Sequence, residues 1–599
     1  MNNIDEVFKH FKNPAESGKK HRSAISKFLK DDEHSVLAIT SIQGSGKTTA
    51  IIDEFAKSED GILLTQSNDK IDELVRIINN RYPELEYKAI YGLERACRSY
   101  RADDGIKKKV GKLRNIGILT EDIHRMICED EECGFLTQDK EMTGRIIESV
   151  ARFEAQITFG KQYHDLHTGR IIFVDEADGL LNRMPTSIPV MPYKNERLRI
   201  ESLYLPKIYR IESPEGTVTE LLEQYKQLLK KGIEENETQI KYFTDLIRLI
   251  TQKFYSVEND KISELSPIFF IFNEVLEKRM KLVIGTASMR NHRINFHRMN
   301  DLMGLAHTLT YAKNLDDLTN GKMTTKQLDR YLQIDDSLRI VKPEILEFEA
   351  DFIPGFIDVF VLQSNSHSYS NAHYKRAFRS NDEELKRKTF KELRSGIIAA
   401  VRFCELQSGR KANRILLITF KTVMNAIEEY RMKLRKQRHG DRDPLFMQMD
   451  ILPLFSNRMH GINANTEGYD LLITIGDPLD PIASKFASDT GIIELNKRGF
   501  RIKEDTDPAI KKEIYRTMIS ELLEAFHRGR SEIPIVDLSN FLTPEDKGDF
   551  RMIKEMLEDD NFTLINVFVK LWKIVHRQRT PEIEVFLTSL KEELGFELK

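Results

Sequence analysis

A glycine-rich turn between a short apolar strand and a helix is the feature that most restricts how this chain can fold. Residues 35–40 (SVLAIT) predict a buried strand, TTAIIDEFAK from Thr48 predicts a helix, and SIQGSGKT (41–48) connects them. Glycines in such a turn let backbone N–H groups point inward, and the N-terminus of the following helix favours negative charge. The pattern predicts a phosphate-binding loop, in which Ser41 stands where the full pattern has its first glycine.

The same turn supplies most of a predicted nucleotide site. Lys47 is expected to reach the β- and γ-phosphates of ATP, and the hydroxyl of Thr48 to bind Mg²⁺. The other ATP-binding residues predicted here are Gln43, Gly44, Ser45, Gly46 and Thr49. A chance match in an ordinary loop is the alternative, but the flanking strand and helix are both in place.

Further strand–helix units follow, as a parallel sheet requires. GILLTQSN (61–68) predicts a strand, and DKIDELVRIIN has apolar residues at helical spacing. A second unit is expected to start at NIGILT (115–120), with EDIHRMI as its helix.

A second nucleotide motif lies in RIIFVDEADGLL (170–181). Four apolar residues, 171–174, predict a core strand that ends in two carboxylates. Asp175 is expected to hold Mg²⁺, and Glu176 to orient and deprotonate the attacking water. An acidic turn after a core strand is the alternative interpretation, which the upstream phosphate-binding loop disfavours.

Asp-Glu-Ala-Asp (175–178) after a core strand resembles the signature of superfamily 2 helicases of the DEAD type. Later segments are similar to further motifs of that family, in the family's order: KLVIGTAS (281–288), RILLITFKT (414–422), SNRMHGINANTEGYDLLITIGDP (456–478) and ELLEAFHRGR (521–530). The resemblance implies two RecA-like domains with ATP in the cleft between them. It implies that Gly461 and Asn463 contribute to ATP binding, that Arg528 is an arginine finger, and that Arg530 is a second catalytic arginine.

A finer resemblance is to the branch that includes XPD and DinG. TVTELLEQYKQLLKKGIEENETQIKYFTDLIRLITQKF (217–254) is a long helical pattern where that branch carries a helical insertion. That branch also has an iron–sulfur cluster, and this chain has Cys97, Cys128 and Cys133 in the corresponding region. His124 could share a helix face with Cys128 and complete a zinc-like set. Three thiolates are one short of a cluster's usual four, and ordinary buried or half-exposed thiols are the alternative interpretation of the whole set. We expect ATP and Mg²⁺ as cofactors and neither iron–sulfur nor zinc.

Composition sets the outer limits. A chain of 599 residues exceeds one hydrophobic core, and four cysteines argue against a secreted disulfide scaffold. The polar N-terminus and the absence of about 18 consecutive apolar residues predict a cytoplasmic protein with no membrane partner. The net charge is only −3, so a nucleic-acid track would be local. The basic runs at 107–114 and 431–442 are candidates, although either could equally be a solvated helix.

These observations predict an α/β chain with the following layout: a first RecA-like domain at 1–335 that contains a helical insertion near 182–275, a second at 336–545, and a helical C-terminal appendage at 546–599. The expected function is that of an ATP-dependent helicase or translocase whose partner is nucleic acid, with DNA favoured over RNA. The sequence does not identify which replication or repair proteins it would bind. The alternatives are a packaging or partition motor, or a scaffold switched by nucleotide.

Overall fold

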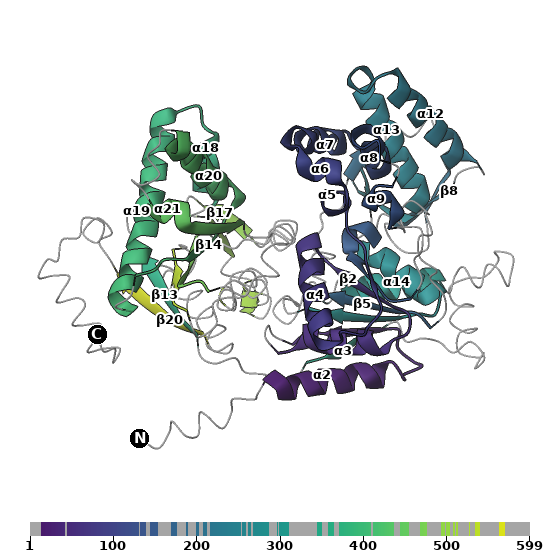
Figure 1. Ribbon diagram of the computed structural model, residues 1–599, viewed down its shortest axis with the longest axis horizontal. Coiled ribbons are helices and arrows are strands. Elements are labelled where there is room, and N and C mark those ends of the chain that lie inside the picture. Colours follow the sequence, from purple (N-terminus) through teal and green to yellow (C-terminus); the bar gives the residue numbers. More distant parts are fainter. Residues whose placement is uncertain are drawn as a thin grey trace, which may run out of the picture.

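In the computed structural model, the chain builds two parallel β-sheets, each with its own helices (Figure 1). The structure describes residues 14–41, 45–130, 132–138, 144–153, 169–176, 187–189, 199–202, 208–212, 216–252, 254–258, 261–264, 267–286, 296, 299–310, 344–349, 357–363, 371–408, 411–436, 444–453, 468–475, 493–496, 499–502, 507–508, 511–512, 515, 526, 533–538 and 562–568. No helix among these residues is both long enough and apolar enough to span a bilayer.

The first sheet has seven strands, and all of its paired strands run parallel. Across the sheet the order is β12 (Leu346–Phe348), β1 (Val36–Ile39), β11 (Lys281–Gly285), β5 (Ile171–Asp175), β2 (Gly61–Thr65), β4 (Ile146–Ser149) and β3 (Lys88–Ala89). The strands predicted within 35–40, 61–68, 170–181 and 281–288 are confirmed as β1, β2, β5 and β11.

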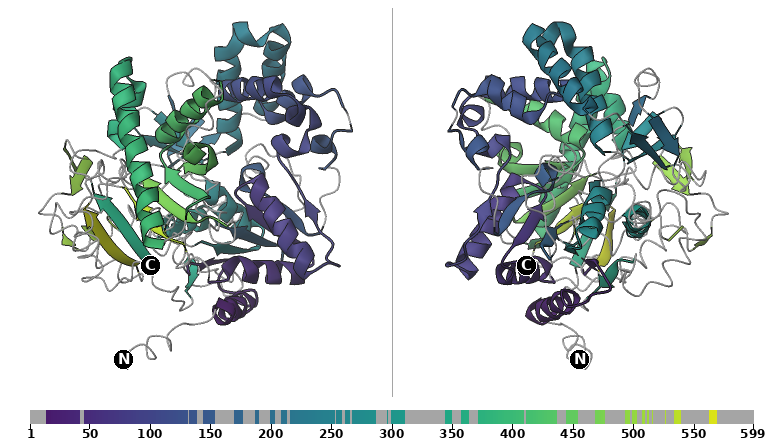
Figure 2. Two further views of the ribbon diagram at one scale, coloured as in Figure 1. Left: turned by 60° about the vertical axis from the view of Figure 1, so that its left-hand side comes forward. Right: turned by 90° about the vertical axis from the view of Figure 1, so that its right-hand side faces the viewer.

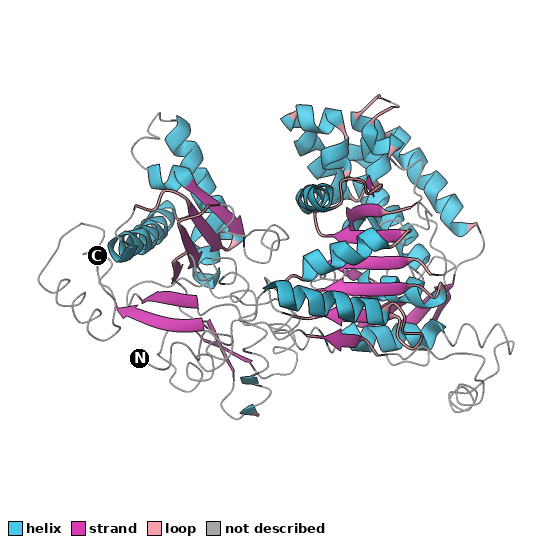
Figure 3. Ribbon diagram, turned by 60° about the horizontal axis from the view of Figure 1, so that its bottom comes forward, coloured by secondary structure: helices cyan, strands magenta, loops and turns pink. Residues whose placement is uncertain are grey.

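Continuous apolar runs make these strands suitable for the centre of the molecule, because a strand covered on both faces has no polar side. Alternate residues of each strand enter different cores: Val36 and Ala38 face one side of the sheet, and Leu37 and Ile39 face the other. Helices cover both faces (Figure 3). α2 (Pro14–Phe28), α3 (Lys47–Lys57) and α4 (Asn68–Arg81) contribute to one core. α14 (Pro267–Glu277) and the helical residues 299–310 contribute to the other.

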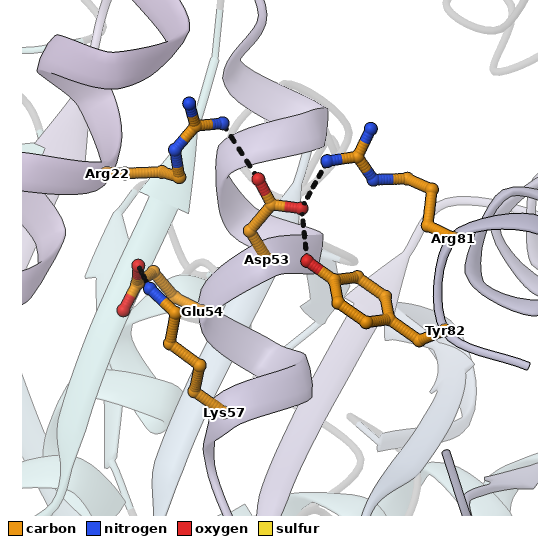
Figure 4. Close-up of polar contacts among 6 residues, drawn as sticks. All are labelled: Arg22, Asp53, Glu54, Lys57, Arg81 and Tyr82. Carbon is orange, nitrogen blue, oxygen red and sulfur yellow. Dashed lines mark hydrogen bonds and ion pairs between the residues drawn. The ribbon is translucent and has the colours of Figure 1, made fainter. Parts of the chain in front are cut away.

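A buried carboxylate connects the three helices of the first face. Asp53, on α3, accepts hydrogen bonds from Arg22 Nη1 at 2.8 Å, Arg81 Nη2 at 2.8 Å and Tyr82 Oη at 2.7 Å (Figure 4). These partners lie on α2 and at the end of α4, so α3 is held from both sides. The guanidinium and hydroxyl donors outweigh burial and lower the pKa of Asp53.

Between β3 and β4 the chain leaves the sheet, and the described residues of this segment, which omit 131 and 139–143, form five helices. They are α5 (Leu93–Ala96), α6 (Arg98–Ala102), α7 (Asp104–Ile116), α8 (Thr120–Ile127) and α9 (Gly134–Thr137). The expected strand at 115–120 is wrong: those residues end α7 and begin α8, with Gly117 at φ 88° closing α7. The apolar GILT segment packs among helices instead of pairing with a strand.

The predicted insertion near 182–275 contains helices, but it is not purely helical. α12 (Thr217–Lys231) and α13 (Ile233–Gln252) share a hydrophobic core with α5–α9, and this helical group stands together in Figure 1. The insertion also holds a five-stranded antiparallel sheet. Its order is β6 (Ser187–Pro189), β10 (Lys261–Glu264), β9 (Phe254–Glu258), β8 (Ile208–Glu212) and β7 (Arg199–Ser202).

The second parallel sheet confirms the other half of the predicted α/β fold. Its order is β15 (Met449–Pro453), β14 (Ile415–Thr419), β16 (Leu471–Ile475), β19 (Ile535–Asp537), β13 (Ile357–Gln363) and β20 (Phe562–Phe568). The accompanying elements are α18 (Asn371–Arg379), α19 (Glu383–Ser408), α20 (Lys421–Lys436), α21 (Pro444–Gln448) and a hairpin of β17 (Ile493–Asn496) and β18 (Gly499–Ile502). Figure 2 shows the long α19 in two further views.

Two expected domain limits need correction. β12 lies beyond residue 335, yet it pairs with β1 and completes the first sheet. Within the expected helical appendage at 546–599, the described residues form β20, which pairs with β13 along seven residues. The segment 562–568 (FTLINVF) is rich in aromatic and β-branched residues, which favour strands.

Candidate ATP site

The described residues at the two ends of the turn between β1 and α3 place Gly46 and Lys47 at the start of the helix. α3 begins at Lys47, and the preceding Gly46 has φ 87°, a left-handed conformation that residues with a side chain rarely adopt. Lys47 Nζ donates a hydrogen bond to the Ser41 carbonyl oxygen at 2.5 Å, so the ammonium group contacts the start of the loop. Ser45 is buried and Thr49 lies in the first turn of α3. Gln43 and Gly44 lie outside the described residues.

Thr48 and Asp175, both predicted Mg²⁺ ligands, are in direct contact. Thr48 Oγ1 donates to Asp175 Oδ1 at 2.9 Å, although 127 residues separate them. The sheet order explains the contact: β1 and β5 lie on either side of β11, so their carboxyl ends meet at one edge of the sheet. Ligands of open parallel sheets bind outside this edge.

One carboxylate oxygen of Asp175 accepts no hydrogen bond from the described residues. Its carboxylate is buried, and Oδ2 has no hydrogen-bond partner among the described residues. Burial raises the pKa of Asp175, opposed by the nearby Lys70 ammonium and the Thr48 hydroxyl. A hydroxyl and a buried carboxylate with a spare oxygen, beside a phosphate-binding turn, are suitable donors for Mg²⁺. The residues present therefore fit this ion.

Glu176 is held in an unusual backbone conformation. Its φ is 58°, in the left-handed region that non-glycine residues seldom occupy. The Gln66 side-chain amide donates to the Glu176 carbonyl oxygen and fixes this turn after β5. The Glu176 side chain keeps 22% exposure, whereas that of Asp175 keeps 3%. Strained conformations of this kind concentrate where a side chain must be aimed.

Lys70 is a member of the site that the sequence analysis missed. It lies in the first turn of α4, whose cap is Ser67, and its side chain is only 9% exposed. Lys70 Nζ lies 4.0 Å from Asp175 Oδ2 and 3.9 Å from Glu176 Oε1, and it pairs with Glu73 at 3.2 Å. Although burial opposes the charge, the three carboxylates raise the pKa of Lys70 above its usual range, so it stays a cation. The sequence feature that could have identified Lys70 is its position on the apolar face of α4, in line with Leu74 and Ile78.

α2 contacts the phosphate-binding turn from outside. Ser17 Oγ donates to the Ser45 carbonyl oxygen at 2.6 Å, and His21 Nε2 lies 2.9 Å from Ser41 Oγ in a hydrogen bond. Burial, together with the neighbouring Lys47 and Arg22 cations, lowers the pKa of His21 to about 4. The Ser41 hydroxyl makes the hydrogen bond with His21, which the glycine expected at this position could not make. Residues 14–28 have no motif, so sequence alone offered no signal for this helix.

β11 brings Gly285 and Thr286 between the two motifs. Gly285 is in register with Ile39 on one side and Asp175 on the other. A Cβ at Gly285 would lie 2.6 Å from Ile51 Cδ1 on α3, so a larger residue there would require the Ile51 side chain to move. Thr286 is buried, and its N–H donates to the Ile39 carbonyl oxygen at 3.0 Å.

The sites predicted in the second half of the chain fall outside the described residues. This applies to Gly461, Asn463, Arg528 and Arg530, which therefore stay predictions. The strands expected within 414–422 and 470–478 are present as β14 and β16.

A groove of 1150 Å³ lies between α18, α19 and α20. Four aromatic side chains line it beside two acidic and eight basic ones; the basic ones are Lys375, Arg379, Lys386, Arg387, Lys391, Arg394, Lys421 and Lys433. One expected track residue is not a surface cation: Arg431 is buried, and its Nε donates to the Phe446 carbonyl oxygen at 2.6 Å. In the run at 107–114, Lys107 pairs with Asp104 at 2.7 Å and Arg114 with Glu94 at 2.6 Å.

Comparison with known proteins gives matches among solved structures alone. No family model and no curated protein sequence matches the chain. The matched structures include an XPD protein and DEAD-box proteins. An XPD protein, Xpd4 of S. tokodaii, is 11% identical with a TM-score of 0.39, and the match covers 92% of this chain and 99% of that one.

Two further structures come from the DEAD-box group. S. cerevisiae Dbp5 bound to RNA and ADP BeF3 is 11% identical with a TM-score of 0.35, covering 94% of this chain and 96% of that one. A DEAD box protein of M. jannaschii is 9% identical with a TM-score of 0.25, covering 90% of each chain. At such identities the chemistry has to be argued from the site residues.

Proposed function

We propose that this chain is an ATP-dependent helicase or translocase that hydrolyses ATP at the edge of its first parallel sheet. The contact between Thr48 and Asp175 carries the proposal, because it joins a phosphate-binding turn to a buried carboxylate. Each motif alone has a structural alternative. Together, with Asp175 Oδ2 accepting no hydrogen bond from the described residues, they form the donor set of a Mg²⁺–nucleotide site.

Each residue has a separate task in the proposed reaction. Lys47 and the backbone N–H groups of the turn bind the phosphates, and Thr48 with Asp175 would hold Mg²⁺. Bound Mg²⁺ would offset charge on the β- and γ-phosphate oxygens. Glu176 orients the attacking water and accepts its proton. Lys70 positions the two carboxylates by its charge.

The second parallel sheet has a part in the proposed cycle. Arg528, with Arg530 beside it, would neutralise the charge that develops on the γ-phosphoryl group, as the motif resemblance implies. Closing and opening of the two domains around ATP would then move bound nucleic acid.

The basic groove beside α19 is the proposed contact for that nucleic acid. Its eight cations can neutralise phosphates, and Phe378, Phe390 and Tyr430 offer faces for stacking bases. Such binding depends little on sequence and strongly on salt, as a moving protein requires. DNA is the favoured substrate, and the RNA bound to Dbp5 makes RNA the second one to test.

ATP turnover with and without polynucleotide tests the proposal. We expect single-stranded DNA or RNA to stimulate hydrolysis, and tailed duplexes to be separated in an ATP-dependent manner. Lys47→Ala should abolish turnover with the fold intact, while Lys57→Met, at an exposed lysine of the same helix, should not. Turnover that polynucleotide leaves unchanged would instead indicate a packaging or partition ATPase, and very slow turnover a nucleotide-switched scaffold.

A further inference from the structure

Three cysteines and a histidine meet in the helical group beside the first sheet. Cys97 lies between α5 and α6, His124 lies on α8, Cys128 follows α8, and Cys133 precedes α9. One ligand atom from each side chain lies within 4.8 Å of the others, and all four residues are buried. The thiols are free of disulfides. From the sequence we named this set of four but predicted no metal; folding brings His124 and the three cysteines together as four possible ligands.

His124 makes the group more than a chance gathering of thiols. Its ring is 1% exposed, and neither Nδ1 nor Nε2 has a hydrogen-bond partner in the described part of the chain. The ring stacks on Phe135 with centroids 5.1 Å apart, so it is held in place by packing. A buried imidazole without partners is costly, and metal coordination is an ordinary way to satisfy it.

We propose that Cys97, His124, Cys128 and Cys133 bind a single tetrahedral metal ion, with Zn²⁺ as the natural occupant. Around zinc, a Zn–S distance of about 2.3 Å places neighbouring sulfurs about 3.8 Å apart. Four donors that all lie within 4.8 Å of one another are close to that spacing. His124 and Cys128 are separated by three residues, and Cys128 and Cys133 by four, which are usual spacings for structural zinc ligands.

The same geometry does not fit the iron–sulfur cluster that the XPD and DinG resemblance implies. In a four-iron cluster each thiolate binds a different iron, so the four ligand atoms stand farther apart than around one ion. Such clusters also use four cysteines, whereas one ligand here is His124. The residues of this chain therefore disagree with the cluster and agree with a mononuclear site.

A bound metal ion would stabilise the short helices around the four ligands. α5, α6 and α9 have four or five residues each, which is far too short for a helix to be stable alone. The four ligands come from the ends of these helices and from α8, so one ion would join them all. Closed sites with four protein ligands contribute directly to folding.

Metal analysis of the full-length protein, purified without chelator, is the test, and it is independent of the ATP site. We expect one zinc per chain. After removal and replacement by Co²⁺, we expect the visible absorption of tetrahedral, thiolate-bound cobalt. Cys128→Ser and His124→Ala should lose the metal. His124→Cys, which keeps four ligands, should retain it, as should Cys404→Ser, a buried thiol of α19 outside the group.

Three results would overturn the proposal. They are iron with inorganic sulfide in place of zinc, a disulfide among these cysteines, and wild-type protein that binds neither zinc nor cobalt. If the ligand variants fail to fold, the metal content and cobalt spectrum of the wild-type chain still decide. Limited proteolysis after chelation should then cut within α5–α9 and spare the first sheet, because all four ligands lie in the helical segment and none lies in the sheet.

Discussion

Lys70 Nζ lies between the two carboxylates that follow β5, 4.0 Å from Asp175 Oδ2 and 3.9 Å from Glu176 Oε1. A buried ammonium at this point balances two negative charges that would otherwise repel each other at the strand end. It comes from α4, while the phosphate-binding turn comes with α3. Both helices are tied to each other through Asp53, so the turn and the cation are positioned by one helical layer.

Removing this cation should change the pH dependence of turnover. In Lys70→Met, the pKa of Asp175 rises further, because its opposing charge is gone. Its carboxylate is then protonated at higher pH, so we expect the acidic limb of the pH–rate profile to move upward and the Mg²⁺ requirement to increase. Rates measured against pH and Mg²⁺ test this, with Lys70→Arg expected to restore the profile. An unchanged pH–rate profile in Lys70→Met would mean that Lys70 only fills space in the fold.

Glu176→Gln should bind ATP but hydrolyse it slowly. The amide keeps the size of the side chain but cannot accept the proton of water, so we expect a loss of ~10²-fold in turnover. Single-turnover hydrolysis and nucleotide binding separate the two effects. Glu73→Gln is the matched control, because Glu73 contacts the same lysine at 3.2 Å from a position on α4. Loss of ATP binding in Glu176→Gln would mean that this residue is structural.

His21 predicts a specific acid sensitivity. Because burial lowers its pKa from 6.5 to about 4, the unfolded chain takes up a proton below pH 6.5 that the folded chain refuses. The stability contributed by neutral His21 is complete above pH 6.5 and is lost as the pH falls toward 4. Over this pH window we expect the free energy of unfolding to fall less in His21→Gln than in the wild-type protein, with a difference on the order of 2 kcal/mol. Parallel denaturation series at each pH provide the measurement, and identical slopes would contradict the assignment.

Arg528→Ala tests whether the second sheet contributes to hydrolysis. An arginine finger acts in the transition state, so ATP affinity should stay within a few-fold while turnover falls by ~10³. Polynucleotide should no longer rescue the rate. Arg530→Ala is measured beside it: a dead Arg530 variant with a nearly normal Arg528 variant would transfer the role to Arg530. Full stimulated turnover in both would remove the second domain from the reaction.

The local parts of the ATP site were predictable from the sequence because each depends on neighbouring residues. A strand buried on both faces needs a continuous apolar run, and 36–39 and 171–174 are such runs. Gly46 at φ 87° and the helix that begins at Lys47 follow from a glycine-rich turn. Parallel order then brings the ends of β1 and β5 to one edge, as the contact of Thr48 with Asp175 demonstrates.

Tertiary structure alone decided which distant residues join these parts. GILT at 117–120 is apolar enough for a strand, yet it packs among helices. The Leu119 N–H, which a neighbouring strand would otherwise bind, donates to Tyr225 Oη of α12 at 3.2 Å. Residues 562–568 pair with β13 across two hundred residues. His124 is an ordinary helical histidine until folding buries it beside three thiols. Periodicity and turn chemistry act over a few residues, whereas burial and charge pairing depend on which surfaces the whole chain brings together.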